Sequence, residues 1–469
     1  MKRLSILTIL SALFAVISAW ATIIIIPTDY PTIQQGIDVS TDNDIVIVLP
    51  GTYAENINFN GHNIVLGSLF YPSHDTFFVS QTIIDGDTSG PVVTFNQGEN
   101  CSARIAGFTI RNGYAVNGGG IICSSSHPTI DHNAIIGNNA DSNGGGIYCD
   151  NSNSQIRSNL IVDNSACSGE GGGIYCRNNP GLVVYGNIIR GNSANDGGGI
   201  YCLSSNPLIR NNIISNNTAT GGPTGNGGGI YLSEAGPDII NNTLGLNSAG
   251  NGGGIAILNA SYPVIINTIF SANVAPIFAQ ILVDDISWST VTYSNIQDTL
   301  WPGAGNLSVD PLFRDTANGD YHLMSISCGD TLDSPCIDAG YPAFIDSLLD
   351  CSWGLGTYMS DMGAYGGGDS VIVGIINYPP IPGEFILMQN YPNPFNSGTT
   401  IRFSIVKSTE VRLAVYDMLG RKVRTLIDEY KQAGIHTANF DATGLSSGVY
   451  FCRLQVGEVV KTRPMVFLK

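Results

Sequence analysis

The sequence predicts an all-β protein, in which a three-sided solenoid of parallel strands is followed by a small immunoglobulin-like β-sandwich. Gly-Gly-Gly-Ile occurs six times, and successive isoleucines are 26, 27, 26, 30 and 25 residues apart. A fixed period of this length indicates stacked repeats, none of which buries its apolar side chains alone. No repeat contains a helix-period stretch of ten residues, which disfavours helical arrays. The isoleucines are Ile121, Ile147, Ile174, Ile200, Ile230 and Ile255.

Residues 1–21 have the three parts of a secretory signal peptide. The basic pair Lys2-Arg3 precedes a mostly apolar run over residues 4–17, and Ala19-Trp20-Ala21 forms a small-x-small cleavage site. We expect cleavage after Ala21, because the run is too short for a membrane anchor. No later segment has eighteen uninterrupted apolar residues, so we expect no transmembrane segment in the mature chain.

Composition divides the mature chain into four parts. We predict a parallel β-helix with an N-terminal cap over residues 22–310, a closing segment over residues 311–370, a proline-rich linker over residues 371–383 and the β-sandwich over residues 384–469. In the cap, Thr32 can begin a short amphipathic helix that places Ile33 and Ile37 on one face. A solenoid needs a lid over its first coil, and this helix can supply it.

The cysteines fall into two groups. Each repeat begins with a short strand whose third residue is cysteine in four copies, followed by leucine and isoleucine in later copies, so this column needs an apolar residue rather than a thiol. Four thiols in a row also cannot surround a tetrahedral metal ion. In the closing segment we expect one disulfide among Cys328, Cys336 and Cys351, with the pairing left open. The column contains Cys123, Cys149, Cys176, Cys202, Leu232 and Ile257.

Two columns of asparagine follow in each repeat, five residues apart. Like residues of successive turns of a parallel β-helix stack about 4.8 Å apart. We therefore expect amide ladders at two bends, with the asparagines in the left-handed backbone conformation. The triple glycines suit a corner with positive φ or close backbone approach. One column contains Asn133, Asn159, Asn187, Asn212 and Asn242, and the other Asn138, Asn164, Asn192, Asn217, Asn247 and Asn273.

The charge is uneven along the chain. Residues 23–373 contain 7 basic and 30 acidic residues, a net charge of −23, whereas residues 384–469 contain 11 basic and 7 acidic residues, a net charge of +4. An acidic body disfavours nucleic acid and anionic membrane surfaces as partners.

The outward columns of the repeats contain few residues that could do chemistry. Asp131 and Arg157 share one column in neighbouring turns, and we expect an exposed ion pair of little energetic weight. His127 and His132 lie beside a proline turn, and we expect both to be exposed. Asp361, in a later loop, could supply a carboxylate by folding back. We therefore predict no catalytic residue and no cofactor, and we leave a metal site open, since calcium is one option that no motif here supports.

A tyrosine column is the best candidate for ligand binding. Aromatic rings about 4.8 Å apart on a flat outward face can stack on sugar rings. Alternatively, the rings stack on one another and cover the sheet. The column contains Tyr148, Tyr175, Tyr201 and Tyr231.

Three stretches resemble known families. Asp29-Tyr30-Pro31-Thr32-Ile33-Gln34, Pro50-Gly51-Thr52-Tyr53 and the asparagine and triple-glycine repeats resemble the right-handed parallel β-helix (pectin-lyase-like) superfamily. Residues 310–313, 334–340 and 361–366 resemble the closing segment of exported β-helix proteins. The tail is similar to the type A C-terminal sorting domain of the type IX (Por) secretion system, through Asn390-Tyr391-Pro392-Asn393-Pro394-Phe395-Asn396, Tyr416-Asp417-Met418-Leu419-Gly420, Leu445-Ser446-Ser447-Gly448-Val449-Tyr450 and Phe467-Leu468-Lys469.

These resemblances imply Sec export to the periplasm and passage through the type IX machinery to the cell surface or the medium. We predict an exported protein that binds carbohydrate or acts as a scaffold or adhesin. The alternative is a polysaccharide lyase, hydrolase or epimerase acting on a face of the β-helix, and the sequence leaves open whether the protein is an enzyme.

Overall fold

The protein forms two compact units, Met1–Ser370 and Val371–Lys469. The computed structural model describes residues 21–346, 349–352, 354–367 and, after a gap, 386–468 except 388, 389, 391, 392, 394, 406–408, 419, 432, 433 and 458. The first 20 residues of the predicted signal peptide and the predicted linker lie outside these ranges. The domain boundaries proposed at residues 310 and 384 stay predictions.

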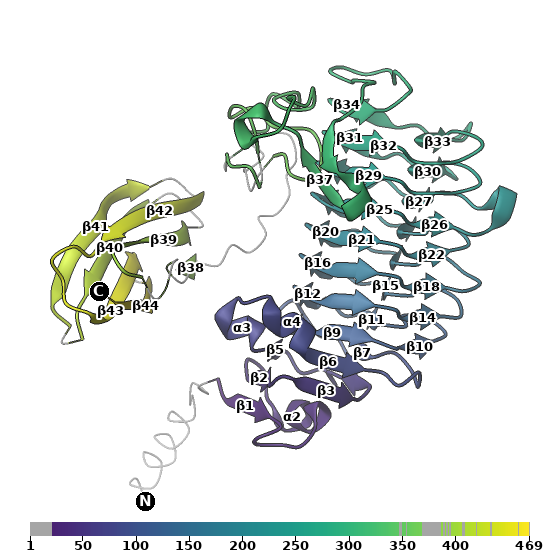
Figure 1. Ribbon diagram of the computed structural model, residues 1–469. Helices are drawn as coiled ribbons and strands as arrows, with labels where there is room; N and C mark the ends of the chain where they lie inside the picture. The colour runs from purple at the N-terminus through teal and green to yellow at the C-terminus, as the bar shows by residue number, and fades with distance from the viewer. Residues whose placement is uncertain are drawn as a thin grey trace, which may run out of the picture. The chain divides into compact units, whose positions relative to one another are not determined.

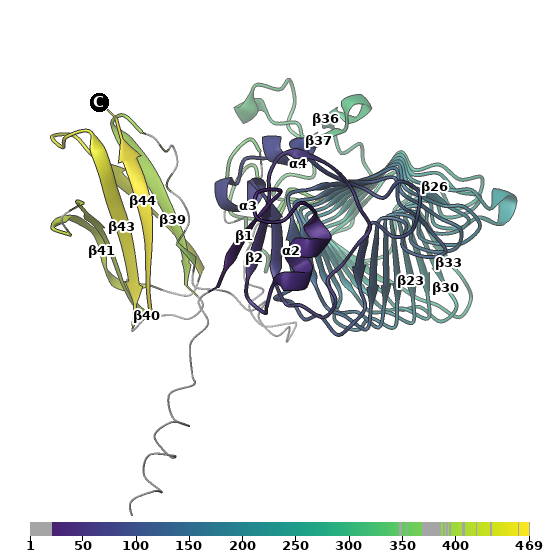
Figure 2. The same cartoon turned by 90° about the horizontal axis from the view of Figure 1, so that it is seen from below.

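The first unit is a right-handed parallel β-helix, as predicted (Figure 1). Each turn contributes a short strand to three long sheets, A, B and C, and each strand pairs in register with those of the turns before and after. Seen along the axis, the turns superpose (Figure 2). A small fourth sheet, D, which the sequence did not predict, adds two-residue strands in five turns.

The strands of each sheet follow in spatial order. Sheet A contains β1 (Ile23–Ile26), β2 (Ile45–Val48), β5 (Val65–Ser68), β8 (Arg104–Ala106), β12 (Thr129–Asp131), β16 (Gln155–Arg157), β20 (Val183–Tyr185), β24 (Leu208–Arg210), β28 (Asp238–Ile240), β31 (Val264–Ile266) and β34 (Thr290–Thr292). Sheet B contains β3 (Gly51–Ala54), β6 (Thr82–Asp85), β9 (Thr109–Arg111), β13 (Ala134–Ile136), β17 (Leu160–Val162), β21 (Ile188–Arg190), β25 (Ile213–Ser215), β29 (Thr243–Gly245), β32 (Ile269–Ser271) and β35 (Asn295–Ile296). Sheet C contains β4 (Ile57–Asn58), β7 (Val93–Phe95), β11 (Ile121–Ser124), β15 (Ile147–Asp150), β19 (Ile174–Arg177), β23 (Ile200–Leu203), β27 (Ile230–Ser233), β30 (Ile255–Leu258) and β33 (Ile281–Val283). Sheet D contains β10 (Tyr114–Ala115), β14 (Asn139–Ala140), β18 (Ser165–Ala166), β22 (Ser193–Ala194) and β26 (Thr218–Ala219).

Columns of isoleucine, leucine, valine and cysteine fill the interior. The central residue of each three-residue strand of sheet B, such as Ile161 or Ile189, is fully buried, as is the cysteine column of sheet C. Cys149 and Cys176 lie directly opposite each other in paired strands. The thiols of the column are free and buried, so they serve as apolar core residues, as predicted.

Two buried asparagine ladders join the turns. Between sheets A and B, the side-chain oxygen of Asn187 accepts a hydrogen bond from the backbone N–H of Asn159 (2.9 Å), and the Asn187 amide donates to the side-chain oxygen of Asn212 (3.0 Å). Between sheets B and D, Asn164 and Asn192 repeat these contacts. The ladders therefore supply acceptors for backbone N–H groups at the bends, where burial would otherwise leave them unpaired.

The left-handed residue lies one position before each ladder asparagine, which corrects the prediction. Ser158 and Asp163 have φ angles of 55° and 54°, and they precede Asn159 and Asn164. The bend itself is made by the preceding residue, because the asparagine must direct its amide along the axis to reach the next turn.

The triple glycines meet both predicted requirements. Gly171 has a φ angle of 67°. A Cβ on Gly172 would overlap the carbonyl oxygen of Ser193, and a Cβ on Gly173 would lie 2.6 Å from the carbonyl oxygen of Gly199. The turns therefore approach too closely at this corner for any side chain.

Three helices cover the N-terminal part of the β-helix. As predicted, α2 (Ile33–Val39) begins at Thr32, whose hydroxyl accepts a hydrogen bond from the Gln35 N–H (3.2 Å), and it buries Ile33 and Ile37 over the first turn. The short helices α3 (Phe70–Ser73) and α4 (Phe77–Gln81) lie beside β5, β6 and β9 (Figure 1). The 3₁₀ turn η1 (Gly222–Thr224) extends the loop after β26.

The closing segment returns along the outside of the β-helix. It contains the hairpin β36 (Phe313–Asp315) and β37 (Asp320–Leu323) and the 3₁₀ turns η2 (Thr316–Asn318) and η3 (Ile326–Cys328). Cys328 and Cys351 form a disulfide, which confirms one bond among the three candidates, and Cys336 is buried and free.

The second unit contains two antiparallel sheets that enclose one apolar core, as expected for a small β-sandwich. Ile401, Phe403 and Ile405 on one sheet and Leu413 and Val415 on the other are buried. One sheet contains β38 (Ile386–Leu387), β39 (Gly398–Ile405) and β42 (Gly434–Asp441). The other contains β41 (Lys422–Lys431), β40 (Thr409–Tyr416), β43 (Gly448–Val456) and β44 (Val459–Phe467).

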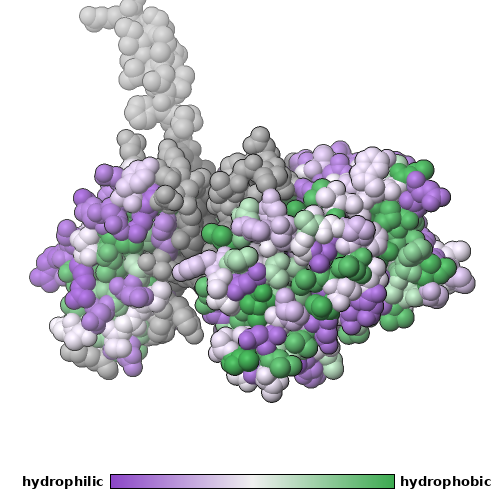
Figure 3. All heavy atoms as spheres, turned by 90° about the horizontal axis from the view of Figure 1, so that it is seen from above, coloured by the Kyte–Doolittle hydropathy of each residue, from purple (hydrophilic) through white to green (hydrophobic). Residues whose placement is uncertain are grey.

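The C-terminal end of the β-helix exposes apolar side chains (Figure 3). Six large residues in the last turns have exposed fractions between 53% and 75%. Strand β33 is the terminal strand of sheet C at this end. The residues are Val274, Ile277, Phe278, Ile286, Trp288 and Leu300.

We predict that Asn192→Ala lowers the free energy of unfolding by about 3 kcal/mol, because it leaves several buried polar groups without partners. Asn192 accepts from the Asn164 N–H and donates to Ile161 and Asn217, each at 3.0 Å. Asn195→Ala, which removes one exposed hydrogen bond to the Ser168 carbonyl, should cost less than about 1 kcal/mol. Denaturant unfolding of the two variants measures the difference, and equal losses would contradict a special role of the ladder.

Candidate functional site

The four predicted tyrosines form a stacked ladder on the outer face of sheet C. Neighbouring ring centroids are 5.2, 5.3 and 4.6 Å apart, with interplanar angles of 0°, 9° and 5°. Tyr175 and Tyr231 are buried, whereas Tyr148 and Tyr201 are half-buried. The self-stacking interpretation is therefore confirmed, and sugar rings cannot enter between the tyrosine rings. Ligand binding by the ring edges and hydroxyls stays a prediction.

The ladder keeps its phenols neutral. Burial raises the pKa of Tyr175 and Tyr231 to about 12, and it raises the pKa of Tyr148 and Tyr201 as well. Tyr148 and Tyr201, the two half-buried members, consequently carry neutral hydroxyl groups that can donate and accept hydrogen bonds.

Two carboxylates beside the ladder were missed by the sequence analysis. Glu170 and Asp196 lie opposite each other in adjacent turns, directly before the triple glycines. Burial, with the charge of Asp196, raises the pKa of Glu170, and burial raises the pKa of Asp196. Their charges also raise the pKa of Tyr201. The sequence could have indicated both residues, because each replaces an asparagine that occupies the same position in the other four repeats. These asparagines are Asn117, Asn143, Asn226 and Asn251.

Asp131 is not part of an exposed ion pair, which corrects the prediction. Its carboxylate is 1% exposed and is bound by Arg104, whose Nε lies 2.7 Å away, and by His132, whose Nδ1 lies 3.1 Å away. Burial acts to raise the pKa of Asp131, but the bonds from His132 and Arg104 outweigh it and lower the pKa. Arg157 is more distant, with its Nε 4.0 Å from the carboxylate.

The two predicted histidines are half-buried rather than exposed. His132 stacks on Phe70 with ring centroids 4.8 Å apart. His127 accepts a hydrogen bond at Nδ1 from the backbone N–H of Asn153 (3.0 Å). Each ring contacts a residue from another part of the chain, so the sequence around the histidines could not predict their burial.

The closing segment docks on asparagines at the corner between sheets A and B. Asn211 donates to the carbonyl oxygens of Ala364 (2.9 Å) and Gly366 (2.8 Å). Asn241 donates to the carbonyl oxygen of Asp361 (3.2 Å), and the Asn267 side chain accepts from the Tyr341 N–H (2.6 Å). These left-handed positions form the A–B corner column, which contains His132, Ser158, Gly186, Asn211, Asn241 and Asn267.

Asp361 holds parts of the closing segment together through hydrogen bonds to backbone N–H groups. Its two oxygens accept hydrogen bonds from the N–H groups of Asp338 (2.8 Å) and Leu355 (2.7 Å). Asp346 binds the N–H groups of Asp361 (3.1 Å) and Gly367. Burial raises the pKa of Asp361 to about 7.

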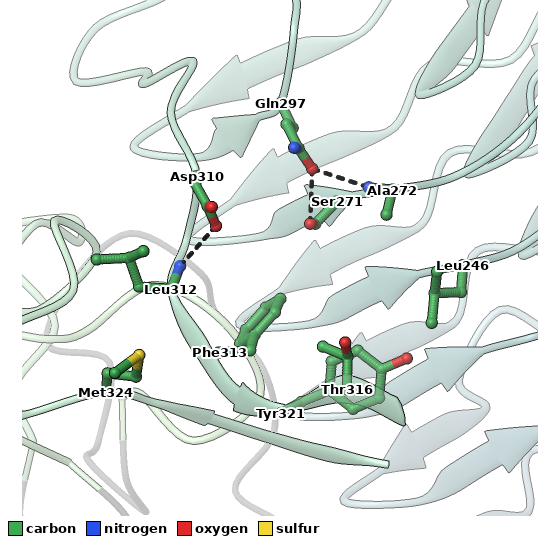
Figure 4. A pocket seen from close by; sticks show the side chains of 10 residues that line it. All are labelled: Leu246, Ser271, Ala272, Gln297, Asp310, Leu312, Phe313, Thr316, Tyr321 and Met324. Atoms are coloured by element: carbon green, nitrogen blue, oxygen red, sulfur yellow. Dashed lines mark hydrogen bonds between the residues drawn. The ribbon is translucent and has the colours of Figure 1, made fainter. Parts of the chain in front are cut away.

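A cavity of about 320 Å³ lies between the hairpin and the bend after sheet B (Figure 4). Phe313, Leu312 and Met324 supply apolar walls. Opposite them, the Gln297 side-chain oxygen accepts hydrogen bonds from the Ser271 hydroxyl (2.7 Å) and the Ala272 N–H (2.9 Å). The polar groups are thus mostly engaged with one another, and the cavity has no cluster of acids and bases.

Metal and membrane features are absent from the described part of the chain. There, no group of three or more histidine, cysteine, aspartate or glutamate side chains is placed to hold a metal ion. Within the same residues, no helix has the length and apolar character needed to span a bilayer.

In the second unit, two distant motifs of the tail meet. Phe395 donates its N–H to the carbonyl of Val466 (3.0 Å) and accepts from the Leu468 N–H (2.8 Å). Its ring packs 5.3 Å from that of Phe467, and the Asn393 side chain accepts from the Val466 N–H (2.7 Å). Asn393 and Phe395 are therefore tied directly to the final strand.

Residues 92–247 match the family described as right-handed β-helix region, and residues 389–467 match the secretion system C-terminal sorting domain. The chain thus contains a right-handed β-helix region and a type IX secretion sorting domain. This β-helix protein is exported by the type IX machinery to the cell surface or the medium. No curated protein matches the chain.

We predict that deletion of residues 389–467 stops export of this β-helix protein and leaves it inside the cell envelope, because the sorting domain is lost. Immunoblots of medium, surface and periplasmic fractions measure the change. Tyr430→Ser, at a side chain 64% exposed and outside the motifs that identify the sorting domain, is the control and should be exported normally. Surface display of the truncated chain would contradict the prediction.

We also predict that the closing segment loses stability as the pH rises from about 4 to about 7. The pKa of Asp361 in the folded protein lies above its ordinary value of 3.8, so its contribution is fully present below that value and is lost as the pH rises to about 7. Limited proteolysis of residues 334–367 across this range measures the opening. Asp361→Asn should flatten the pH dependence, although it also loses one backbone acceptor, and an unchanged slope would contradict the assignment.

Proposed function

We propose that this exported β-helix protein binds polysaccharide along sheet C and acts as a non-catalytic scaffold or adhesin at the cell surface. The observation that carries the proposal is the tyrosine ladder, which fixes the half-buried Tyr148 and Tyr201 at the same position of the turn on sheet C. Repetition along the axis favours a polymeric ligand, because Tyr148 and Tyr201, two turns apart, offer the same group to separate units of the polymer.

The ladder supports contact through ring edges rather than ring faces. Neighbouring tyrosines occupy each other's faces, so the available groups are the hydroxyls of Tyr148 and Tyr201 and the polar side chains beside them. Stacking also pre-organises the side chains, which lowers the entropy lost on binding.

The alternative function, polysaccharide hydrolysis, is supported by Glu170 and Asp196. Glycosidases use two carboxyl groups, one of which is kept protonated by a raised pKa. Both residues have raised pKa values and lie beside the same tyrosines. The scaffold proposal is preferred because Asp196 is already held by the next turn, where the backbone N–H (2.6 Å) and the side-chain amide (3.2 Å) of Asn226 donate to its carboxylate.

We predict that Tyr148→Phe combined with Tyr201→Phe weakens retention on a polysaccharide column by about tenfold, because two hydroxyl contacts are lost while the stack remains. Elution from columns that each carry one polysaccharide of a panel measures the retention of the variant, and thermal unfolding checks its fold. Tyr175→Ser with Tyr201→Ser should abolish retention. Unchanged retention in both double variants would remove sheet C as the binding face.

The same panel separates binding from catalysis. We expect no new reducing ends and no unsaturated products, with or without Ca²⁺. If products form and Glu170→Gln abolishes them, the hydrolase alternative replaces the scaffold proposal.

A further inference from the structure

The corner between sheets C and A changes its residue type in the last two turns. From β12 onward, the position two residues before each sheet A strand is histidine, asparagine or glycine, and then tyrosine and tryptophan. Asn206 shows the earlier role, because its side-chain oxygen accepts a hydrogen bond from the Gly236 N–H of the next turn (2.7 Å). In the last two turns the Trp288 N–H donates instead to the carbonyl oxygen of Ser261 (3.2 Å), so the aromatic rings need another explanation. This C–A corner column contains His127, Asn153, Gly181, Asn206, Gly236, Tyr262 and Trp288.

Trp288 has one ring face open to solvent. Its ring packs on that of Tyr262, with centroids 4.0 Å apart and an interplanar angle of 40°, and the exposed fractions of Trp288 and Tyr262 are 64% and 41%. Strand β34 is terminal in sheet A among the described strands, so the column has no later member to cover the second face of Trp288. The inner rings of the tyrosine ladder, by contrast, have neighbours on both faces. A stacked ring therefore keeps a free face only where its column ends.

The backbone fixes the turn that carries this ring. Besides the bond from the Trp288 N–H to the Ser261 carbonyl, the Ser261 N–H donates to the hydroxyl oxygen of the buried Ser287 (3.0 Å). Asp284, in the same turn, accepts from the Asn259 N–H of the turn before (2.7 Å). The ring is consequently presented from a fixed position, which lowers the entropy lost when a ligand binds.

Closing the end of the core is not the role of Trp288. Trp301, in the loop that follows β35, packs against the buried core of the β-helix and is half-buried. A ring that closed the core would be shielded in this way, whereas Trp288 is exposed. Burial of an aromatic ring is favourable, so contact with a ligand would recover a gain that folding leaves unused.

Negative charge at this corner disfavours an anionic ligand. Asp284 and the exposed Asp285 lie in the turn that leads to Trp288. Burial acts to raise the pKa of Asp284, but hydrogen bonds from Ser287 and Asn259 outweigh it and lower the pKa, so this carboxylate is ionised at neutral pH. Carboxylates repel anionic sugars and accept hydrogen bonds from sugar hydroxyls.

The open indole face matches the flat side of a pyranose ring. An aromatic face carries the negative part of the ring quadrupole, and the axial C–H groups of a β-linked glucose unit present weakly positive hydrogens to it. Such a unit has hydroxyl groups around its rim, where the carboxylates of the turn can accept their hydrogen bonds.

We propose that Trp288, supported by Tyr262, is a stacking site for a neutral β-linked pyranose polymer. The inference rests on the proposed function for the choice of a polysaccharide, and it names the class of sugar. It also supplies a contact with a ring face, which the tyrosine ladder cannot offer. The two features meet near the end of the ladder, where the Asn259 side-chain amide donates to the Tyr231 hydroxyl (3.5 Å).

Calorimetric titration of the full mature chain with cellohexaose, a neutral β-linked glucose hexamer, tests the site. We expect saturable binding together with a change in tryptophan emission. The glucuronate hexamer with the same linkage, which adds only carboxylates, should bind at least about tenfold more weakly. Equal binding of the two hexamers, or no saturable binding of cellohexaose, would overturn the proposal.

Variants locate the site. Trp288→Ala should weaken cellohexaose binding at least about tenfold and remove the emission change, whereas Trp288→Phe should retain part of the binding. Ile286→Ser, at a side chain 62% exposed in the same turn, is the matched control and should bind normally. Circular dichroism checks the fold of each variant. Equal losses for Trp288→Ala and Ile286→Ser would indicate general apolar adhesion and overturn the assignment.

The polysaccharide columns separate this inference from the proposed function. If Trp288→Ala binds cellohexaose like the unaltered chain, while Tyr148→Phe with Tyr201→Phe weakens column retention, the stacking site is wrong and the polysaccharide proposal stands. If the unaltered chain is retained on no column and does not bind cellohexaose, both are wrong.

Discussion

At two bends of every regular turn, a backbone N–H has no partner within its own turn, and the asparagine of the next turn accepts its hydrogen bond. The contact works only if each asparagine lies directly above the previous one. Strand pairing, the isoleucine columns and the triple-glycine corner all obey the same register. A turn displaced by one residue would lose the ladder bonds and expose its core residues together, which makes the stack cooperative.

The same register explains the tyrosine face. Four tyrosines at one position of the turn must lie within stacking distance of each other, whatever their function. Stacking takes up the ring faces, so only the ring edges and hydroxyls stay open to further contacts, beside the carboxylates of Glu170 and Asp196. The regular fold thereby limits which kinds of contact this face can make.

The A–B corner column shows how a regular fold acquires local sites. Every member adopts the left-handed backbone, but the side chains differ along the axis. Asn211, Asn241 and Asn267 hold the closing segment, while His132 contacts α3 and Asp131. Variation at a position that every turn must contain therefore decides where covering segments dock and where cavities remain.

The sequence by itself determined the period, the parallel strands, the inward columns, the asparagine ladders and the sorting tail, because each is a local or periodic property of the chain. It also identified Thr32 as the start of the capping helix, since capping needs a few adjacent residues. Only the tertiary structure decided that Asp131 is buried, that Cys328 pairs with Cys351 and that Glu170 and Asp196 flank the tyrosines. These outcomes depend on which residues from other turns, or from a returning segment, lie against each side chain, and no local pattern encodes that.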